Sequence, residues 1–297
     1  MLKKKIEKNI FFHKLKYSNL SLILKNYHKY FLKKINTKSS IKIENRNLII
    51  KLAETNSEIK KAQSLRYSVF YKEKNAKASL LKKMLRRDFD KIDRFADHLI
   101  VIDKNRRNLH NNIIGTYRLI RGDLASQYGG FYTSTEFDLS NIFHSYKNNQ
   151  ILELGRSCIH KKYRNGSTVS LLWKAIANYV SVYDIKILLG CASFPGTNVM
   201  TFSDELAYLK KNHSLQSELS VKSLDVNIYQ INNSKNKNVN DLKLFTTLPP
   251  LIKGYLRVGG KVSESCFVDH DFNTIDLCVV VQTNVINNKY KKRFYTS

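Results

Sequence analysis

The chain has 297 residues, of which 42% are hydrophobic, so it can bury one sizeable core or two small ones, and intrinsic disorder is excluded as the default. Its formal net charge of +27 favours an anionic partner such as nucleic acid, lipid headgroups or an acidic protein, although a lysine-rich solvated surface explains the charge equally well. Four cysteines without a CxxC pair exclude a disulfide-stapled secreted fold, and no run approaches the roughly 18 to 20 apolar residues of a membrane span.

The amino-terminal region, residues 1–45, differs from the rest of the chain in its charge. It holds 12 Lys and only Glu7 and Glu44 as acids, and apolar residues recur at helical spacing between Leu20 and Ile35. A helix with one apolar and one cationic face suits an anionic membrane, but a basic leader or a helix packed on the domain fits equally well. We expect this extension to carry no chemistry. The protein is then cytoplasmic, either free or peripheral on the inner face of the cytoplasmic membrane.

Residues 46–297 are predicted to form a single domain. A short strand at Ile49 leads into Thr55-Asn56-Ser57-Glu58, a capping-box pattern that starts a helix. Residues 98–103 and 113–121 have the composition of strands and are joined by a turn, so they predict an antiparallel hairpin.

A strand, a loop and a helix follow between residues 151 and 183. Residues 151–158 predict the strand, and a hydroxyl cap at Ser167 or Thr168 starts a helix that ends near Asp184. The apolar run at 185–194 then predicts a buried strand parallel to the first, because strand, helix and strand over this length form a right-handed crossover.

The carboxy-terminal third contains a polar segment followed by a predicted helix and two predicted strands. Residues 232–240 are Asn-rich and predict an exposed excursion. A short helix is expected after Pro249-Pro250, followed by strands near 266–269 and 275–282.

The loop between the strand and the helix reads Tyr163-Arg164-Asn165-Gly166-Ser167-Thr168. A polar loop with a glycine before a helix presents free backbone N–H groups to an anion such as phosphate. A glycine before a capped helix more often only makes a turn, so this loop alone is a weak signal.

Glu153 and Arg156 are charged residues within the otherwise apolar strand before that loop. Burying them costs several kcal/mol unless they are paired or used, so we expect either a functional site or a structural salt bridge with Arg118 or Arg66. Strand alternation would place the two on opposite faces, but a bulge at Gly155 would bring them to one site and splay this strand from its parallel neighbour. Two splayed parallel strands form a slot for an extended ligand.

These motifs resemble a known family. Glu-Leu-Gly-Arg before a basic glycine loop, with the segment 65–70 upstream, resembles the autoinducer-synthase branch of the GNAT acyltransferases. Longer motifs at 115–119, 129–132, 136–139, 191–197 and 248–257 resemble the ornithine-lipid N-acyltransferases, also called hemolysin-like, and the resemblance covers residues 48–293.

The resemblance implies an α/β fold of the GNAT acyl-CoA N-acyltransferase type, with a mixed sheet and splayed parallel strands. It also implies attack of the ornithine α-amine on a 3-hydroxyacyl thioester to give a lyso-ornithine lipid, the first step of ornithine lipid synthesis. The donor is expected to be acyl carrier protein, whose phosphopantetheine thioester is a cosubstrate, so no separate cofactor is implied. The sequence keeps only Arg164, Gly166 and the capped helix of the fuller phosphate loop of coenzyme A enzymes, which suits a carrier donor.

The resemblance also suggests roles for individual residues. Glu153 is the expected base for the α-ammonium, and backbone N–H groups from Arg156 to Cys158 are expected to hold the oxyanion. The other expected roles are the substrate carboxylate for Arg66 and Arg118, a substrate contact for Phe70, and the donor phosphate for Arg164, Gly166, Ser167 and Thr168. The acidic set Asp88, Asp90, Asp93 and Asp97 is expected to receive the side-chain ammonium or to order the loop over it, although a solvated charge run around Arg86, Arg87 and Lys91 fits these residues equally well.

Two alternatives remain open at this stage. An acyl-homoserine-lactone synthase would share Arg66, Phe70, Glu153 and Arg156 but accept S-adenosylmethionine; the Pro-Pro motif and the chain length argue against it. A nucleic-acid-binding module would fit the charge, but no helix-turn-helix, RNP or zinc signature is present, and we expect no nucleic-acid partner. No spacing of His, Cys or acids predicts a metal site.

Overall fold

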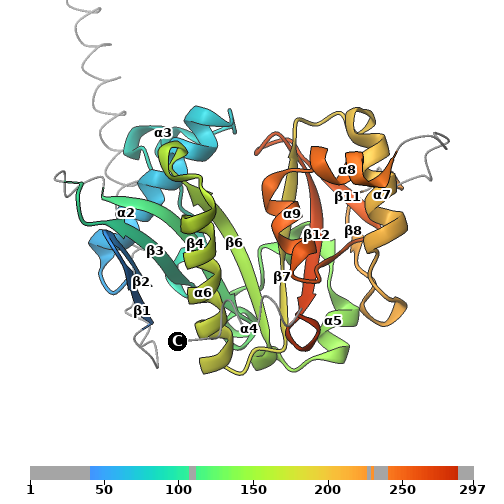
Figure 1. Ribbon diagram of the computed structural model, residues 1–297, viewed down its shortest axis with the longest axis horizontal. Coiled ribbons are helices and arrows are strands. Elements are labelled where there is room, and N and C mark those ends of the chain that lie inside the picture. Colours follow the sequence, from blue (N-terminus) through green and yellow to red (C-terminus); the bar gives the residue numbers. More distant parts are fainter. Residues whose placement is uncertain (1–40, 107–111, 226–228, 231–239, 287–297) are drawn as a thin grey trace, which may run out of the picture.

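The computed structural model describes residues 41–106, 112–225, 229–230 and 240–286. Ten strands form one mixed sheet in the order β1-β2-β3-β4-β6-β7-β12-β11-β9, with β10 paired to β12 (Figure 1). The strands of this sheet are β1 (Lys42–Asn45), β2 (Leu48–Leu52), β3 (Asp97–Asp103), β4 (Ile113–Arg121), β6 (Ile151–Ile159), β7 (Ile187–Pro195), β9 (Tyr229–Gln230), β10 (Lys261–Val262), β11 (Ser265–Asp269) and β12 (Thr274–Gln282).

Helices cover both faces of this sheet. The α-helices are α2 (Asn56–Tyr67), α3 (Leu80–Leu85), α4 (Gly122–Tyr128), α5 (Ser140–Ser145), α6 (Gly166–Val182), α7 (Ser203–His213), α8 (Asp241–Thr247) and α9 (Pro250–Arg257). Short turns of π- or 3-10 helix lie at η1 (Ser68–Glu73), η2 (Lys91–Arg94), η3 (Thr133–Thr135), η4 (Asn148–Gln150), η5 (Lys161–Tyr163), η6 (Val199–Phe202), η7 (Ser217–Leu219) and η8 (Thr283–Val285), and β5 (Phe137–Asp138) pairs with β8 (Lys222–Ser223).

The amino-terminal half of the sheet follows from local sequence signals. Thr55 Oγ1 accepts a hydrogen bond from the Glu58 N–H at 3.2 Å, and Glu58 Oε2 accepts one from the Thr55 N–H at 3.3 Å, so the predicted capping box at the start of α2 is confirmed. The predicted hairpin is also present, as the antiparallel pair β3 and β4. Strand β1 pairs with β2, so the sheet begins before residue 46; the amphipathic helix predicted upstream lies outside the described residues.

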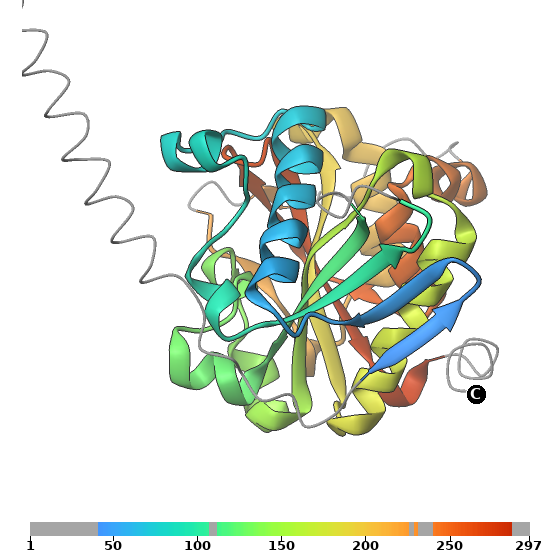
Figure 2. The ribbon, with the colours of Figure 1, turned by 90° about the vertical axis from the view of Figure 1, so that its left-hand side faces the viewer.

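Two layers of apolar side chains hold the helices to the sheet. α6 buries Leu172, Ile176 and other residues against Leu152 and Leu188 on one face, where α9 also packs. α2 buries Ala62, Leu65 and neighbours on the opposite face (Figure 2). The start of α6 corrects one prediction: its cap is Asn165, whose side chain accepts from the Thr168 N–H at 3.0 Å, because Asn competes with Ser and Thr for this position.

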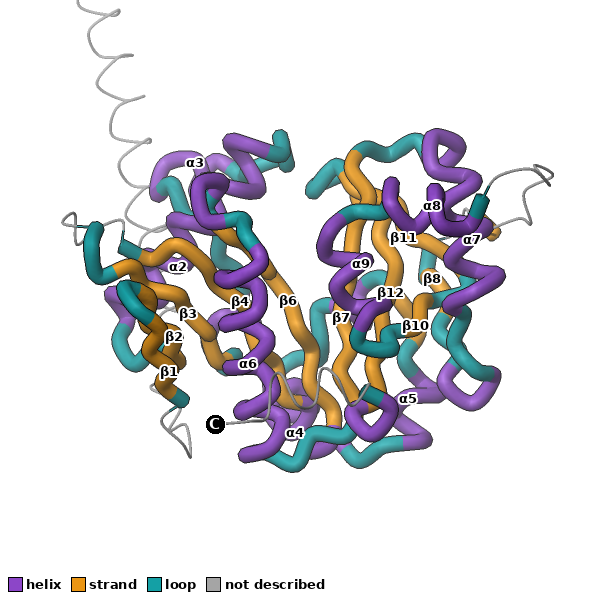
Figure 3. The backbone as a smooth tube through the Cα atoms, viewed as in Figure 1, coloured by secondary structure: helices purple, strands orange, loops and turns teal. Residues whose placement is uncertain are grey.

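Strands β6 and β7 separate after a short parallel contact. They pair only from Ile151 to Glu153 on β6, against residues 187–189, and then diverge (Figure 3). Gly190 sits at the point of divergence, where a Cβ atom would lie 2.4 Å from the Leu154 carbonyl oxygen, so only glycine allows this close approach. The predicted parallel strands and their splay are therefore confirmed. We call this point of divergence the fork.

The strand that forms one arm of the fork contains the predicted bulge. The register of β4 and β6 shifts between Thr116 and Arg118, so Arg156 and Ser157 together oppose one residue of β4. Arg156 has φ 49°, in the left-handed region, which places the irregularity one residue after Gly155.

In the carboxy-terminal part, α9, β11 and β12 agree with the predicted helix and strands, whereas the predicted excursion lies outside the described residues except for Asn240. No helix in the described ranges is long and apolar enough to cross a membrane.

Candidate active site

The strand register brings several polar residues to one face of the sheet beside the fork. Glu153 pairs with Leu189, and alternation along β7 then puts Cys191 and Ser193 on the same face. Asp276 of β12 lies directly opposite Ser193. Residues of β7 beyond the fork, such as Cys191 and Ser193, are partly exposed, whereas those before it are buried, so this face opens where the strands separate.

Glu153 lies at the last position of β6 that pairs with β7. The residue is 1% exposed, and its carboxylate accepts a hydrogen bond from the Thr133 N–H at 3.0 Å. Thr133 follows Gly129 and Gly130, whose φ values of 122° and 86° turn the chain toward the sheet. Burial raises the pKa of Glu153, although Arg118 and the Thr133 N–H oppose the shift. A carboxylate in this state is suited to accept a proton.

The Arg156 side chain reaches the same site because of the bulge. Its guanidinium lies between two rings, 4.4 Å from the centroid of Tyr132 and 4.7 Å from that of Phe272. Arg156 Nη2 donates to Asp90 Oδ2 at 3.3 Å, and Nε lies 3.4 Å from Asp88 Oδ2. These contacts stabilise the left-handed backbone conformation of Arg156.

Three arginines and three aspartates form a network next to Glu153, which we call the arginine cluster; its members are Arg66, Asp88, Asp90, Asp93, Arg118 and Arg156. Arg66 is fully buried and donates from Nε to Asp88 Oδ2 at 2.9 Å and from Nη1 and Nη2 to Asp93 at 3.0 and 2.7 Å. It presents no open guanidinium fork to a ligand. Arg118 Nη1 donates to Asp90 and Asp93, but its Nε and Nη2 are buried without a partner in the described part of the chain.

The aspartates of this cluster face guanidinium groups. Asp93 accepts from Arg66, Arg118 and Gln63, and Asp90 accepts from Arg118 and Arg156. Asp90 also caps η2 by accepting from the Ile92 N–H at 2.9 Å. The structure thus places Asp90 and Asp93 as partners of arginines.

Asp97 lies apart from this cluster. It points to the other face of the sheet, where it accepts from Tyr179 Oη at 2.6 Å. Phe70, expected near the substrate, lies on η1 with its ring centroid 5.8 Å from that of Phe272, one ring away from Arg156.

The expected donor loop lies at the amino end of α6. Asn165 accepts from the Thr168 N–H, so the preceding N–H groups of Gly166 and Ser167 remain at the helix end. The Thr168 side chain is buried. Arg164 forms a bidentate ion pair with Glu73 and donates from Nε to the Ile159 carbonyl oxygen at 2.9 Å, which ties the loop to η1.

Comparison with known proteins decides the family. The GNAT acetyltransferase domain family matches residues 65–174. An L-ornithine N(alpha)-acyltransferase of Rhodobacter capsulatus is 37% identical over 250 residues, 83% of this chain and 94% of the relative. The chain belongs to the L-ornithine N(alpha)-acyltransferase family. The protein of that name from Agrobacterium fabrum is 36% identical over 241 residues, 81% of this chain and 82% of the relative. A crystal structure of the AHL synthase LasI aligns with 84% of this chain and 94% of its own at 14% identity, with a TM-score of 0.43.

Membership of the L-ornithine N(alpha)-acyltransferase family makes the chain an acyltransferase and confirms the resemblance and the GNAT fold predicted from its motifs. Acyl transfer to an amine needs a proton acceptor, an oxyanion site and an open path for the acyl donor. Glu153 lies buried at the fork, and beyond it β6 and β7 no longer pair with each other.

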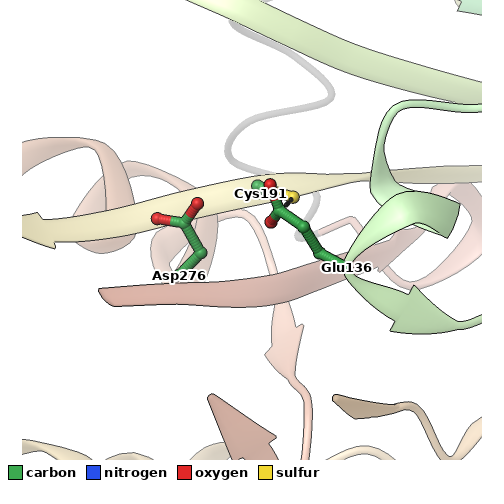
Figure 4. Close-up of side chains that lie close together, drawn as sticks. All are labelled: Glu136, Cys191 and Asp276. Carbon is green, nitrogen blue, oxygen red and sulfur yellow. Dashed lines mark hydrogen bonds between the residues drawn. The ribbon is translucent and has the colours of Figure 1, made fainter. Parts of the chain in front are cut away.

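A second polar cluster of this acyltransferase was not predicted. Glu136, Cys191 and Asp276 place one ligand atom each within 4.8 Å of one another, and we call them the acid–thiol cluster (Figure 4). Cys191 Sγ donates to Glu136 Oε2 at 3.1 Å. Two carboxylates and a thiol are a donor set for a cation. The motifs that begin at Glu136 and Cys191 contribute to the family resemblance but predict no site, and the available signal for one is Asp276, a lone acid in an apolar strand.

Proposed function

We propose that this acyltransferase transfers a 3-hydroxyacyl group from the phosphopantetheine thioester of acyl carrier protein to the α-amine of L-ornithine, forming a lyso-ornithine lipid. Family membership supports the acceptor, because the relatives are L-ornithine N(alpha)-acyltransferases. The observation that carries the proposal is the buried Glu153 carboxylate at the fork, where the strands open to admit an extended thioester.

The reaction begins with loss of a proton from the α-ammonium. Glu153 accepts it directly or through water, since burial raises its pKa and makes it a better base. The free amine attacks the thioester carbonyl carbon, and a tetrahedral oxyanion forms. Backbone N–H groups from Arg156 to Cys158, on the arm of β6 that β7 leaves unpaired, stabilise this oxyanion. Collapse breaks the C–S bond, the attacking nitrogen gives up its second proton, and the departing thiolate takes up that proton to become the carrier thiol.

Arg118 and Arg156 hold the carboxylate of the amino acid. Arg118 keeps two buried nitrogen atoms without partners among the residues that the structure describes, and Arg156 is the more exposed guanidinium of the pair. A guanidinium binds a carboxylate through paired hydrogen bonds, which would satisfy these donors. Arg66 then has a supporting role, because it holds Asp88 and Asp93 in place.

The donor phosphate binds at the start of α6, through the N–H groups of Gly166 and Ser167 and the guanidinium of Arg164. The basic surface attracts the acidic carrier protein, and this attraction weakens as salt screens it. Residues 1–45 add a peripheral contact with anionic membrane, so removing them should reduce binding to anionic liposomes and leave turnover in detergent unchanged.

The test is transfer by the purified protein from a 3-hydroxyacyl carrier thioester and, separately, from the matching coenzyme A thioester, with L-ornithine as acceptor. We expect product from the carrier donor with a KM that rises with salt, and poor use of the coenzyme A donor. Equal use of both donors without a salt effect would contradict the carrier assignment. Transfer to S-adenosylmethionine instead of ornithine would contradict the acceptor.

A further inference from the structure

The carboxylates first expected to bind the side-chain ammonium of the acceptor already have cationic partners. Asp88 and Asp93 pair with Arg66, and Asp90 pairs with Arg118. An acceptor with a second amine therefore needs another anionic group near Glu153, because a buried ammonium without a counter-charge is costly.

The acid–thiol cluster contains such groups with unused hydrogen-bonding capacity. Glu136 and Asp276 are 3% and 4% exposed. The Asp276 carboxyl interacts by hydrogen bonding with Ser193, Thr274 and Glu136, and that of Glu136 with Tyr132 and Cys191. One oxygen of each, Glu136 Oε1 and Asp276 Oδ1, is nevertheless buried without a hydrogen-bond partner among the residues that the structure describes. Cys191 occupies only the other oxygen of Glu136 (Figure 4). Buried carboxylate oxygens without donors indicate that a donor is supplied by a ligand.

The charge of this cluster points to a cationic ligand. None of the ion pairs formed within the described ranges includes Glu136 or Asp276. Burial, reinforced by the charge of Asp276, raises the pKa of Glu136 to about 8. Burial likewise raises the pKa of Asp276 to about 6. A bound cation would restore the ionised form of both groups.

The position of the cluster matches the second amine of the acceptor. Thr133 donates its N–H to Glu153 and also contacts Cys191, with 3.7 Å between Sγ and Oγ1. Tyr132, the residue before it, stacks on Arg156. One short segment, residues 132–136, thus touches the proposed carboxylate site at Arg156, the base and the acid–thiol cluster, so the three lie close enough together to meet the carboxylate, the α-amine and the side chain of one amino acid.

We propose that Glu136 and Asp276 bind the side-chain ammonium of the acceptor amino acid and so select a diamino acid. This inference rests on the proposed function, in which the acceptor is L-ornithine, and it adds the residues that recognise the side-chain ammonium of that acceptor. The ammonium donates to Glu136 Oε1 and Asp276 Oδ1, and Cys191 holds Glu136 in position through its other oxygen.

The test compares equilibrium binding of L-ornithine and L-norvaline, which has the same carbon chain without the terminal amine, by titration calorimetry of the full chain without donor. We expect the wild type to bind ornithine about 100-fold more tightly than norvaline, since a site built for a charged donor rejects an analogue that lacks it. The variant Glu136→Gln/Asp276→Asn should bind both with a ratio of about 3 or less, mainly through weaker ornithine binding.

The matched control is Asp97→Asn, which alters a buried carboxylate on the opposite face of the same sheet and should leave the ratio at the wild-type value. The single variants Glu136→Gln and Asp276→Asn provide further tests if the double variant folds poorly. The proposal is overturned if the wild type does not prefer ornithine, or if the preference survives in folded variants. It is also overturned if the purified protein retains one equivalent of divalent metal that the double variant loses.

Binding and turnover separate the two proposals. A protein that prefers ornithine through this cluster but transfers no acyl group would contradict the proposed function and leave the binding site intact. A protein that acylates norvaline as well as ornithine would keep the acyltransferase reaction and overturn the role of Glu136 and Asp276.

Discussion

The arginine cluster and the acid–thiol cluster lie on the same face of the sheet but balance their charges differently. The first matches three guanidinium groups with three carboxylates, so its charges balance without a ligand, and only hydrogen-bond donors such as Arg118 Nε and Nη2 lack a partner among the described residues. The second has two buried carboxylates that form no ion pair with any described residue. One oxygen of each carboxylate also lacks a hydrogen-bond donor in the same ranges. Glu153 lies between them. The first cluster is therefore electrically neutral by itself, whereas the second carries negative charge that only a bound cation or proton would neutralise.

Replacing Glu153 itself should give the largest effect. Glu153→Gln keeps the shape of the side chain but removes the base, so kcat should fall about 100- to 10,000-fold with little change in KM for the carrier. Because burial raises the pKa of Glu153, wild-type kcat/KM should fall on acidification through a pKa above 4.5. The variant should regain activity at high pH, where more amine is already deprotonated. Glu58→Gln, in the capping box at the start of α2 and outside the site, is the matched control. If the Glu153→Gln variant kept a third or more of the wild-type kcat, Glu153 would not be the base, and another group would have to accept the proton.

Breaking the arginine cluster should chiefly affect stability. Arg66→Met leaves Asp88 and Asp93 buried without their main partner, so the free energy of unfolding in urea should fall by about 3 to 5 kcal/mol. Lys83→Met, on the exposed face of α3, should change it by less than about 0.5 kcal/mol. A similar small change for both variants would show that the arginine cluster does not hold the fold together.

The two clusters should respond to pH in opposite directions. Burial alone would raise the pKa of Asp88, but Arg66 outweighs it and holds that pKa well below its ordinary range. Asp88 therefore contributes stability above about pH 4 that is lost on acidification. Glu136, with a pKa of about 8 against 4.5, binds a proton more tightly when folded, so its contribution is full below about pH 4.5 and is lost as pH rises through 8.

Urea unfolding measured between pH 5 and 8.5 checks the second half of this contrast. As the pH rises over this range, the free energy of unfolding of the wild type should fall by on the order of 3 kcal/mol because of Glu136. The variant Glu136→Gln should lose this dependence and unfold at a higher urea concentration than the wild type above pH 7. Saturating L-ornithine should also reduce the slope in the wild type. An identical slope in the wild type and the variant would contradict an uncompensated carboxylate in the acid–thiol cluster.

The smallest effect should lie on the donor loop, outside both clusters. Arg164 is partly exposed, so Arg164→Ala should raise KM for the carrier thioester only about two- to fivefold and leave ornithine binding unchanged. Glu73→Gln releases the guanidinium from its ion pair and should keep or lower that KM. If Glu73→Gln raised KM as much as Arg164→Ala did, the ion pair would only shape the loop.

Much of the framework could be predicted because it depends on local signals. The capping box before α2, the parallel strands around α6 and the bulge next to Gly155 each follow from residues close together in the sequence. The cap of α6 was misplaced because Asn165, Ser167 and Thr168 are all good capping residues within one turn.

The partners of buried charges could not be predicted in the same way. Arg66 was expected to meet a substrate, but η2 and the segment before it bring Asp88 and Asp93 to it across more than 20 residues of chain. The register of β7 and β12 brings Cys191 near Asp276, and Glu136 reaches them from the segment before β5. Such contacts depend on tertiary packing, which composition and periodicity do not specify.

The account is tested most directly by identifying which nitrogen of ornithine is acylated. The purified enzyme would be given a 3-hydroxyacyl carrier thioester with L-ornithine labelled with ¹⁵N at either the α- or the δ-position, and the product amide would be analysed by fragmentation mass spectrometry. With the α-amine at Glu153 and the side-chain ammonium at the acid–thiol cluster, the amide nitrogen should carry label only from α-labelled ornithine. Label from the δ-position, or no amide product at all, would contradict the account.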